Sequence, residues 1–548
     1  FEYTGPESDD IIDKVFNKKR ADDRKLWLGA YDRKTYLDTN HSNVTYQDFI
    51  DREMIHFSKY DCDRSIPNMM DGLKISLRKI LYSAFKKNLT QEIKVAQFSG
   101  YVSEHSGYHH GEASLNGAIV GMAQNFVGSN NVNLFCPNGQ FGTRLQGGKD
   151  SASERYIFTQ LQNITRKIYP AYDDNVLTYM EDDGFPVEPI YYMPIIPMVV
   201  INGSKGIGTG FSTEIIPHHL PTVVDYIRCN LTGKGTDDIK FLPYYEGFTG
   251  TIESISDSKY LIKGKYSLVD DHNIHITELP IGTWTDDYKE YLEKLLDGGV
   301  DRAGKKVASS IKDFRDMSKT TNIDFHVQFA DSVKLYKLMS TYGENGVSGL
   351  EKLLRLTTTV STTNMHLFDE NERLRKYARV EDIIDNYYGV RLSGYISRKA
   401  YIVGILAKEL EILSNKSRYI SEVLEGTIDI RRKKRDMIVK MLCDKKYDII
   451  GDDTEYKYLL KMTMDSVSDE NVAKLNNEHA MKTTELERIQ STRPEDMWIS
   501  DLDDMMLEYT KHIAVRKFDS DVCDGVKGVK CVKGVKGVKG VKGVKGVK

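Results

Sequence analysis

The sequence predicts an α+β protein of several domains, and three observations lead to that prediction. Amphipathic helical segments alternate with glycine-rich loops early in the chain, a middle stretch is rich in β-branched and aromatic residues, and long helical repeats follow. A single hydrophobic core stops growing at about 250–300 residues, so a chain of 548 residues divides into domains. We place the domains at residues 1–45, 46–170, 171–380, 381–515 and 516–548.

Composition narrows the class of protein. No run of about 18 apolar residues predicts a membrane-spanning helix, so we expect no membrane partner, and no charged-then-apolar leader predicts secretion. The six cysteines lack paired or zinc-binding spacing, which favours a reducing, intracellular environment. The chain begins at Phe1 rather than Met, which indicates a fragment or a processed piece.

Charge is unevenly distributed along the chain. The formal net charge is −4, but residues 523–548 carry eight Lys and one Asp, so the remainder is near −11. If the protein binds DNA, its basic groups must gather on one surface. The Gly-Val-Lys repeats of residues 525–548 cannot form a core, so we predict a disordered cationic tail over 516–548 without a catalytic role.

Residues 1–45 are polar and charged, which predicts a connector entering a domain; Arg24 and Lys25 close its basic stretch. In residues 46–170 the clearest helix is Ser76–Lys87, where an apolar face containing Ile80 and Leu81 lies apart from Arg78. With the preceding Asp71-Gly72 turn, the pattern fits a helix-turn-helix that reads DNA. An ordinary surface helix with solvated cations is the plainer alternative.

Arg155-Tyr156 is a candidate for covalent chemistry. A tyrosine can attack a phosphodiester to form a phosphotyrosyl ester, and a neighbouring cation can stabilise the charge that grows on the phosphate oxygens. The chain has 33 tyrosines, however, and most tyrosines are packing residues with a polar tip.

His109 and His110 directly precede an amphipathic helix that carries Leu115, Ile119, Met122 and Phe126 on one face. A helix N-terminus can hold a phosphate through its free N–H groups and its dipole. A metal site is a rival interpretation, although adjacent histidines are not the usual ligand spacing, and a capped helix with surface histidines is a third.

The glycine-rich segment 203–210 resembles a dinucleotide loop only loosely, and residues 147–150 lack the Ser or Thr that a phosphate-binding loop needs after its Lys. We reject both as nucleotide sites. A turn that approaches DNA, with Ile207 as an apolar wedge between base pairs, is the favoured interpretation, and a core position for Ile207 is the alternative.

The later domains are predicted from their periodicity. Strand-like runs at Pro194–Asn202 and His272–Leu279 indicate an α+β domain over 171–380. From residue 381 the chain has a repeat of apolar residues spaced by seven and four. Together with a second helical stretch at about 466–490, this repeat predicts an antiparallel coiled coil; its residues are Tyr395, Ile402, Leu406, Leu413, Ile420 and Leu424. Residues 425–465 between the two helices would form a small globule at its tip.

These segments together resemble the eukaryotic type of DNA topoisomerase II, a type IIA enzyme family that also occurs in large DNA viruses. The motifs lie in order from about residue 11 to 515: Arg64-Ser-Ile-Pro-Asn, Asp71-Gly-Leu-Lys, Tyr108-His-His-Gly-Glu, Phe141-Gly-Thr-Arg, Gly147-Gly-Lys-Asp-Ser-Ala-Ser, Arg155-Tyr-Ile-Phe, Gly206-Ile-Gly-Thr-Gly and Glu278-Leu-Pro-Ile-Gly-Thr-Trp-Thr. Ile75 and Leu77 depart from the family's usual Pro and Gln, which affects the turn before Arg78.

The resemblance implies a winged-helix (CAP-like) domain, an α/β tower domain, and a coiled coil that ends in a small C-gate globule. It implies that Tyr156 is the nucleophile and that Arg155 stabilises the transition state. Ile207 would intercalate into a bent DNA segment. The remaining implied DNA contacts are Arg24, Lys25, Arg64, Lys74, Arg78, Tyr108, His109, His110, Ser114 and Trp284.

The resemblance also implies what lies outside this chain. The family's ATPase domain and its acidic metal-binding domain have no match here, so Mg2+ and ATP would serve the intact enzyme, and we predict no metal site on this chain. The implied partners are double-stranded DNA, a second copy in a homodimer, and the two missing domains. The implied location is the nucleus of a cell, or the host cytoplasm or viral factory for a viral protein.

Three alternatives stay open from the sequence. The chain could be a separate gate subunit of a multi-chain topoisomerase, or a meiotic-type DNA-cleaving protein that shares the tyrosine mechanism. A non-enzymatic DNA-bridging protein, in which Tyr156 is only structural, is the third.

Overall fold

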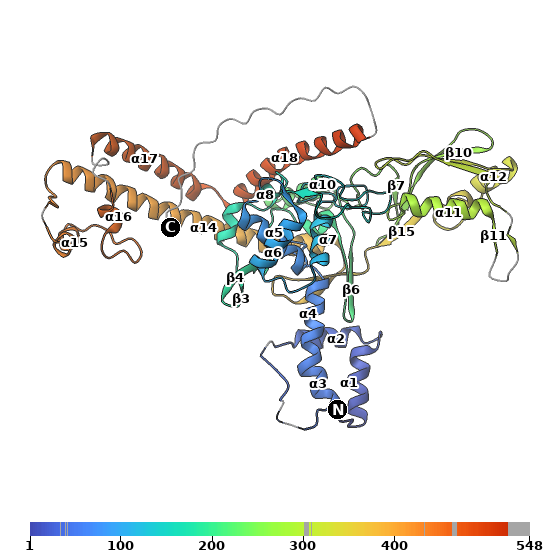
Figure 1. Ribbon diagram of the computed structural model, residues 1–548, viewed down its shortest axis with the longest axis horizontal. Helices are drawn as coiled ribbons and strands as arrows, with labels where there is room; N and C mark the ends of the chain where they lie inside the picture. Colours follow the sequence, from blue (N-terminus) through green and yellow to red (C-terminus); the bar gives the residue numbers. More distant parts are fainter. Residues whose placement is uncertain are drawn as a thin grey trace.

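The computed structural model describes residues 1–32, 34–38, 40, 42–300, 306–307, 309–431, 433–462 and 468–523. A central body carries three projections (Figure 1). We call them the stalk (residues 1–65), the sheet arm (residues 251–361) and the helix arm (residues 400–491). The predicted mixture of helix and sheet with one very long helix is confirmed.

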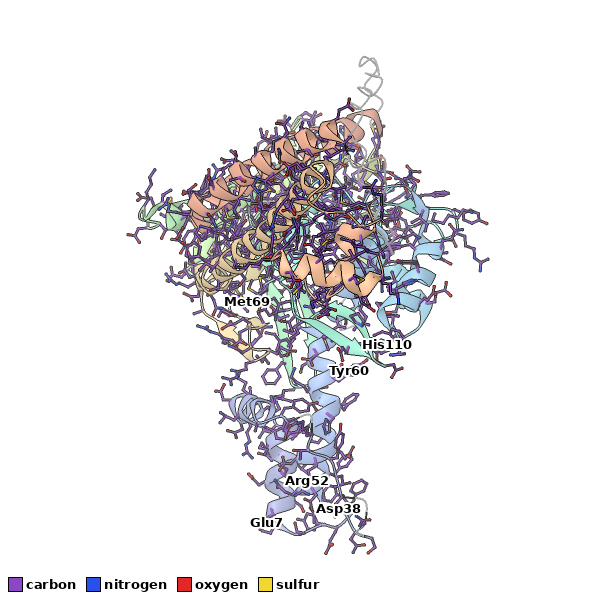
Figure 2. All side chains as sticks on the ribbon, turned by 90° about the vertical axis from the view of Figure 1, so that its left-hand side faces the viewer. Glu7, Asp38, Arg52, Tyr60, Met69 and His110 are labelled. Atoms are coloured by element: carbon purple, nitrogen blue, oxygen red, sulfur yellow. The ribbon has the colours of Figure 1, made fainter. Side chains whose placement is uncertain are left out.

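The stalk is a small helical unit at the N-terminus (Figure 2). It contains α1 (Pro6–Phe16), α2 (Ala21–Gly29), α3 (Tyr46–Phe49), a π-helical turn (Ile50–Met54) and α4 (Ile55–Ser65). Its core joins Ile11, Trp27 and Ile50 to Phe211 and Phe368 of the body, so the stalk is packed onto the body through apolar contacts.

The body holds the helices that surround the largest core. They are α5 (Ile75–Lys87), α6 (Val95–Ser106), α7 (Glu112–Ala123), α8 (Thr165–Ile168), α9 (Met198–Asn202), α10 (Leu220–Thr232) and α18 (Pro494–Cys523), with a 3-10 turn at Ala171–Asn175. The predicted helix Ser76–Lys87 is confirmed as α5. One apolar cluster runs from Met69 to Tyr509 and includes residues on both sides of positions 170 and 380.

Short antiparallel hairpins project from the body. The pairs are β1 (Ile93–Lys94) with β2 (Phe158–Thr159), β3 (Tyr179–Asp182) with β4 (Phe185–Pro189), β5 (Ser204–Gly208) with β6 (Phe211–Ile215), and β16 (Met365–Phe368) with β17 (Leu374–Tyr377). The hairpins β3–β4 and β5–β6 point toward the stalk side of the body (Figure 1).

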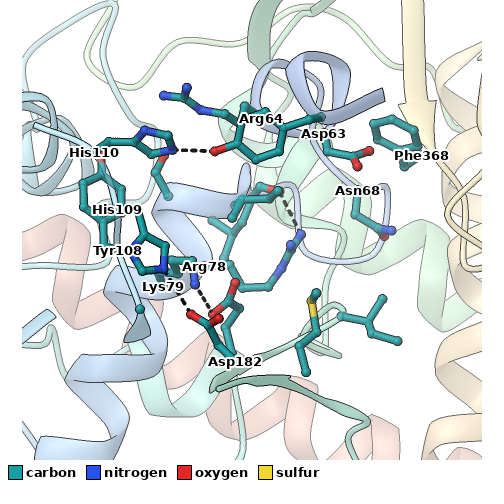
Figure 3. Close-up of a pocket in the computed structure, with 18 of the residues that line it drawn as sticks. Asp63, Arg64, Asn68, Arg78, Lys79, Tyr108, His109, His110, Asp182 and Phe368 are labelled. Atoms are coloured by element: carbon teal, nitrogen blue, oxygen red, sulfur yellow. Dashed lines mark hydrogen bonds and ion pairs between the residues drawn. The ribbon is translucent and has the colours of Figure 1, made fainter. Parts of the chain in front are cut away.

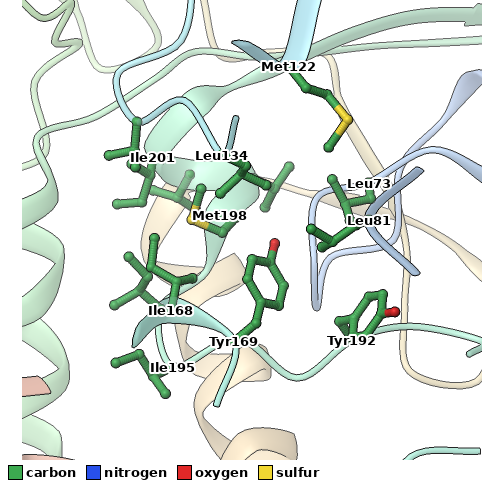
Figure 4. Packing of buried hydrophobic residues seen from close by; sticks show 14 of the residues in the cluster. Leu73, Leu81, Met122, Leu134, Ile168, Tyr169, Tyr192, Ile195, Met198 and Ile201 are labelled. Carbon is green, nitrogen blue, oxygen red and sulfur yellow. The ribbon is translucent and has the colours of Figure 1, made fainter. Parts of the chain in front are cut away.

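The predicted strand at Pro194–Asn202 is wrong. Its second half forms α9, and Ile195, Met198 and Ile201 lie in the core beside Tyr169 (Figure 4). A short apolar run that is buried on all sides has no periodicity to distinguish a strand from a helix, and β-branched composition alone misled the prediction.

The sheet arm has a core of its own. A three-stranded sheet contains β7 (Thr251–Ser256), β8 (Lys259–Lys263) and β15 (Thr357–Ser361) in the order β15-β8-β7. A four-stranded sheet contains β9 (Lys265–Leu268), β10 (Asn273–Glu278), β13 (Asp313–Asp316) and β14 (Phe325–Gln328) in the order β13-β14-β10-β9. The predicted strand at His272–Leu279 is thus confirmed as β10.

Three helices and shorter elements complete the sheet arm. These elements are α11 (Thr285–Asp297), β11 (Gly299–Val300), β12 (Lys306–Val307), α12 (Ser332–Ser340), a 3-10 turn (Glu344–Gly346) and α13 (Gly349–Leu353). Ile274, Ile276 and Phe325 of the four-stranded sheet pack against Tyr288 and Leu292 of α11. The alternation of buried and half-buried residues in β10 leaves the other face of this sheet partly exposed.

Helix α14 (Val380–Leu424) begins in the core of the body, and its C-terminal part pairs antiparallel with α17 (Asp469–Ser491) to form the helix arm. Lys399 Nζ donates to the carbonyl of Gln490 at 2.8 Å, Lys482 pairs with Glu409, and Ser417 Oγ donates to Asn476 Oδ1 at 2.6 Å. In these three contacts the residue number increases along α14 while it decreases along α17, so the two helices run antiparallel.

At the tip of this arm, α15 (Arg435–Asp444) and α16 (Lys457–Leu460) surround a separate small cluster that contains Tyr419, Leu442 and Tyr456. No helix among the described residues is long and apolar enough to span a membrane. Cys62, Cys136, Cys229 and Cys443 are free. The first residues of the predicted disordered tail, 516–523, form the end of α18, and residues 524–548 lie outside the described residues.

Candidate nucleic-acid interface

Tyr156 lies on a tight turn that holds its backbone and leaves its ring in solvent. The ring is 76% exposed, whereas the next residue, Ile157, is buried. The N–H groups of Val95 and Ala96, the first residues of α6, donate to the carbonyls of Ile157 and Glu154 at 3.0 and 3.1 Å. These N–H groups have no partner within their helix, so they donate to the carbonyls of the turn. The two hydrogen bonds in turn fix the position of the turn that carries Tyr156.

Arg155 is exposed beside Tyr156, and among the residues that the structure describes its guanidinium has no hydrogen-bond or ion-pair partner. A free cation beside a free hydroxyl is a suitable arrangement for an incoming phosphate. The geometry therefore leaves the predicted nucleophile and the predicted stabilising cation both accessible.

Several of the other predicted residues line one cavity of about 290 Å³ between α4, α5 and the β3–β4 hairpin (Figure 3). Arg64, Arg78, Tyr108, His109 and His110 contribute to its wall, whereas Arg155 and Tyr156 do not. His110 Nε2 lies 2.6 Å from the hydroxyl of Tyr60, and His109 Nε2 lies 3.3 Å from Asp182 Oδ2.

The accessible positive charge of the cavity wall comes from its exposed residues. Burial, together with the positive charge of Arg64, lowers the pKa of His110, which favours the neutral imidazole. Arg64 is exposed, and its guanidinium lies 5.7 Å from the centre of the Tyr60 ring. Arg64 is therefore a cation that can reach a ligand at the cavity mouth.

Arg78 differs from Arg64 because it is buried. Its Nε lies 2.7 Å from Asp71 Oδ2 and its Nη2 lies 3.1 Å from Asp71 Oδ1, while Nη2 also donates to the carbonyl of Leu73. Asp71 in turn accepts from the N–H of Tyr192 at 2.9 Å. The guanidinium thus anchors α5 to the turn before it and is not free to meet a phosphate in this conformation. Tyr108 is likewise buried.

The glycine-rich segment forms the β5–β6 hairpin, and its glycines explain its position. A Cβ at Gly206 would lie 1.8 Å from the carbonyl oxygen of Ser65, and one at Gly208 would lie 3.1 Å from the Cα of Cys62. Only glycine lets this strand lie against α4 so closely. Ile207 points the other way and is 79% exposed, so the core position considered for it from the sequence is wrong.

Lys74 ties the same hairpin to the body. Its Nζ donates to the carbonyl of Lys205 at 2.9 Å, and burial lowers the pKa of its ammonium. Lys74 therefore lies beside the hairpin that carries Ile207, but its donor is already shared with the backbone.

The stalk residues are also engaged. Arg24 is buried, donates to the carbonyl of Asn17, and lies against Gly210 at the tip of the hairpin. Lys25 pairs with the exposed Asp22 at 2.8 Å. An exposed ion pair contributes little to stability, so Lys25 can leave Asp22 and bind a ligand, whereas Arg24 is held in its buried position.

Trp284 and Ser114 have different surroundings. A Cβ at Gly147 would lie 2.3 Å from the Trp284 ring, whose centre is 5.8 Å from that of Phe126. Trp284 thus packs the sheet arm against the body while part of its ring stays exposed. Ser114 is exposed in the first turn of α7, which begins at Glu112 directly after the two histidines.

Sequence reasoning missed three polar residues of the cavity. Tyr60 holds His110, Asp182 holds His109, and Glu188 binds the Lys79 ammonium at 2.8 Å. Glu188 and Asp182 lie in a hairpin far along the chain, so no local spacing identifies them. Tyr60 precedes Arg64 by four residues on a helix, and that spacing is a signal the sequence does contain.

Comparison with known proteins places this geometry in a family. Residues 64–503 match the family model for DNA gyrase/topoisomerase IV, in its A-type subunit. The chain belongs to this family. Residues 1–62 match a second model, the C-terminal associated domain of TOPRIM.

Three similar relatives of this topoisomerase family member come from eukaryotes. The chain is 38% identical over 94% of its length to DNA topoisomerase 2 of Plasmodium falciparum, and 39% identical over 93% of its length to DNA topoisomerase 2 of Arabidopsis thaliana. It is 40% identical over 92% of its length to DNA topoisomerase 2-alpha of Gallus gallus. It spans 38%, 36% and 34% of those relatives, in that order.

The fold agrees with a solved member of the family. The crystal structure of the Plasmodium falciparum topoisomerase II DNA-binding, cleavage and re-ligation domain superposes with a TM-score of 0.83 at 39% identity. The match covers 94% of this chain and 71% of that one. The resemblance inferred from the motifs is therefore confirmed for nearly the whole chain.

Proposed function

We propose that this chain is the DNA-cleaving and DNA-gating part of a type IIA DNA topoisomerase, with Tyr156 as the nucleophile. The observation that carries the proposal is the 76% exposure of the Tyr156 ring on a turn fixed by the N-terminus of α6. No other tyrosine among the described residues is as exposed. A reactive group held rigidly in solvent meets the positional demand of attack on a large polymer.

The reaction conserves the energy of the DNA backbone bond that it breaks. The Tyr156 oxygen loses its hydroxyl proton and forms a bond to a backbone phosphorus, one phosphorus–oxygen bond of the DNA breaks, and the departing sugar oxygen takes up a proton. The reverse attack restores the strand without an external energy source. In this proposal Arg155 neutralises charge that builds on the phosphate oxygens in both directions.

The DNA path that we propose begins at the exposed groups. Arg64, His109, His110 and Ser114 would contact backbone, with Lys25 at the stalk and Lys74 beside the hairpin. We retain Arg24, Arg78 and Tyr108 as residues that shape this path from beneath it. Affinity would come mainly from phosphates and fall steeply with salt.

Ile207 would supply the wedge. An isoleucine that is 79% exposed at the edge of a hairpin is costly in water and suited to insertion between base pairs. Selectivity would then reflect how easily a sequence bends rather than direct reading of bases. Trp284 would add a contact where the sheet arm meets the body.

In family terms, we assign the winged-helix domain to residues 46–170, the tower to 171–380, and the coiled coil with its C-gate to 381–515. We propose a two-fold dimer with one Tyr156 for each DNA strand and an exit gate at the tips of the helix arms. The intracellular location follows from the work on DNA that we propose.

Magnesium and ATP belong to other parts of the longer protein in this proposal. Among the described residues, the one cluster of three metal-ligating side chains contains two imidazoles, whereas magnesium prefers a set of oxygen ligands. We therefore derive no catalytic step through magnesium from residues of this chain.

The test is a trap for the covalent intermediate. The full-length protein is incubated with magnesium and supercoiled plasmid and then denatured, and protein–DNA adducts are counted. We expect adducts with the native chain and none with Tyr156→Phe. The matched control is Tyr172→Phe, because Tyr172 is 61% exposed on another turn of the body.

The control variant should form adducts at the native level. If adducts persist in Tyr156→Phe, Tyr156 is not the nucleophile. If the native protein bridges DNA but forms no adduct under any of these conditions, the non-enzymatic alternative replaces the proposal.

A further inference from the structure

The exposed face of the four-stranded sheet carries a compact group of three metal-ligating side chains. His275 lies on β10, Asp324 directly precedes β14, and His326 is the second residue of β14. His275 Nε2 is 2.9 Å from Asp324 Oδ1, and His326 Nε2 is 3.2 Å from the same oxygen. All three ligand atoms lie within 4.8 Å of one another.

Sheet geometry brings the three residues together. His275 and His326 are direct partners across the antiparallel β10–β14 pair, and their rings stack with centres 4.3 Å apart. Asp324 and His326 are two residues apart, so they share a face of the strand. The opposite face is the buried core of the sheet arm, which fixes both strands beneath the group.

The backbone of Asp324 is held in place independently of the histidines. The Asp324 N–H donates to Ser318 Oγ at 3.0 Å, and the Asp324 carbonyl accepts from the N–H of Met317 at 2.8 Å. These bonds close the end of the β13–β14 hairpin. Asp324 therefore presents its side chain to the histidines without depending on them for its backbone position.

We propose that His275, Asp324 and His326 form a binding site for a divalent transition-metal ion of the zinc type. Two imidazoles and one carboxylate form a ligand set that zinc accepts, with water in the fourth position. Zinc ligands lie about 2.0–2.2 Å from the ion, and hence about 3.3 Å from one another in a tetrahedron. The observed separations approach that arrangement, so small side-chain rotations complete it.

The surroundings set the strength of the site. Arg315 of β13 is the register partner of His326 and lies on the same face, where its positive charge opposes a cation. Neither Nδ1 atom of the two histidines has a partner among the described residues. Water then serves as the outer hydrogen-bond partner, so the site exchanges its metal with chelators rather than keeping it permanently.

An ion here would join β10 to β14 through side chains. Both strands lie in the middle of the four-stranded sheet. A ligand that binds only the folded sheet stabilises it by mass action, so zinc would raise the unfolding temperature of the sheet arm. This inference is independent of the proposed DNA chemistry, because none of the three residues belongs to the proposed DNA path.

The test uses the full chain, free of a histidine tag and stripped of metal. Zinc binding is followed by calorimetry, and cobalt(II) is titrated while visible absorption is recorded, because its spectrum reports nitrogen and oxygen coordination. We expect one ion per chain, which a chelator removes. Asp324→Asn should weaken binding about tenfold or more, and the double variant H275Q/H326Q should remove it.

Two further variants sharpen the outcome. Arg315→Gln should strengthen binding, because it removes the opposing charge. His272→Gln, in the turn before β10 and outside the group, should bind as the native chain does. Unfolding scans without metal verify that each variant is folded, and Asp324→Asn keeps the test informative if the double variant is not.

Any ion held by the histidines of the cavity remains in the double variant and is subtracted. If zinc uptake and the cobalt spectrum are the same in the native chain, Asp324→Asn and H275Q/H326Q, the group is an ion-pair cluster and the proposal is overturned. Absence of uptake by the native chain has the same consequence.

Discussion

Arg155 and Arg78 belong to the same body, and a sequence pattern assigns both to DNA, yet the structure treats them in opposite ways. Arg155 is exposed without a partner among the described residues, and Arg78 is buried in a two-point ion pair with Asp71. A cation therefore contributes to a nucleic-acid surface only if its charge is not already paired with an acidic residue inside the fold. A free cation acts on the ligand, whereas a buried one acts on the fold.

Breaking the buried pair is the largest effect that we expect. Arg78→Ala leaves the Asp71 carboxylate buried without its cation, so the free energy of unfolding should fall by about 3–5 kcal/mol. Urea unfolding monitored in the body measures the loss. Arg64→Ala, which removes an exposed cation of the same cavity, should change stability by less than about 0.5 kcal/mol.

The opposite pattern would invert the comparison. If Arg78→Ala kept its stability and lost DNA affinity with the salt dependence of a phosphate contact, Arg78 would be a DNA ligand rather than an anchor of α5.

Arg155→Ala should affect chemistry and leave the fold unchanged. A cation that stabilises charge only in the transition state contributes roughly 10²–10³-fold to the rate when it is well placed. We therefore expect DNA cleavage by the full-length protein to slow by that factor, with an unchanged unfolding curve. Lys149→Ala serves as the control, since it removes another cation of the same loop region.

Rapid-quench measurement of adduct formation gives the rate. Native cleavage rates in Arg155→Ala would mean that the free guanidinium has no catalytic part.

The histidines extend the comparison to pH. His109 is exposed, whereas His218 is buried and burial lowers the pKa of its ring to about 4. An unfolded histidine has a pKa of about 6.5. Between these values the unfolded chain binds a proton that the folded chain refuses, so stability is lost as pH falls below about 6.5.

The expected slope is about 1.4 kcal/mol per pH unit for His218 alone. Urea midpoints measured from pH 7.5 to 5.5 should decrease, and His218→Gln should flatten the decrease. His512, whose pKa burial also lowers to about 4, contributes in the same direction. A decrease that persists unchanged in both His218→Gln and His512→Gln would contradict the burial argument.

The sequence predicted those parts of the molecule in which local pattern and environment agree. Helix α5 has an amphipathic repeat and begins within one residue of its predicted start. The antiparallel helix pair follows from its apolar spacing, and Tyr395 and Ile420 of that spacing are buried. The run Pro194–Asn202 failed because a segment surrounded by core has no periodicity that shows which element it forms.

Site residues could be predicted from the sequence only where their exposure to solvent could also be predicted. Motif resemblance identified Tyr156 and Ile207, but nothing local showed that Ile207 projects while its neighbouring glycines face α4. The Asp71 partner of Arg78 lies seven residues away and was readable in principle. The ligand group of the sheet arm was not, because His275 and Asp324 are joined only by strand pairing.

Ile207→Ala is the smallest change in stability and the finest test of exposure as a guide to function. The side chain is 79% exposed, so its loss should alter the free energy of unfolding by less than about 0.5 kcal/mol. Its effect should appear on DNA instead, because a shorter side chain cannot hold two base pairs apart. Energy transfer between dyes at the ends of a short duplex should report less bending, with weaker preference among sequences of different flexibility. Val333→Ala is the matched control, since Val333 is 75% exposed on α12 of the sheet arm. Equal bending by both variants would show that an exposed apolar residue on this hairpin serves another purpose, and that freedom from the fold is necessary for a DNA contact but not sufficient.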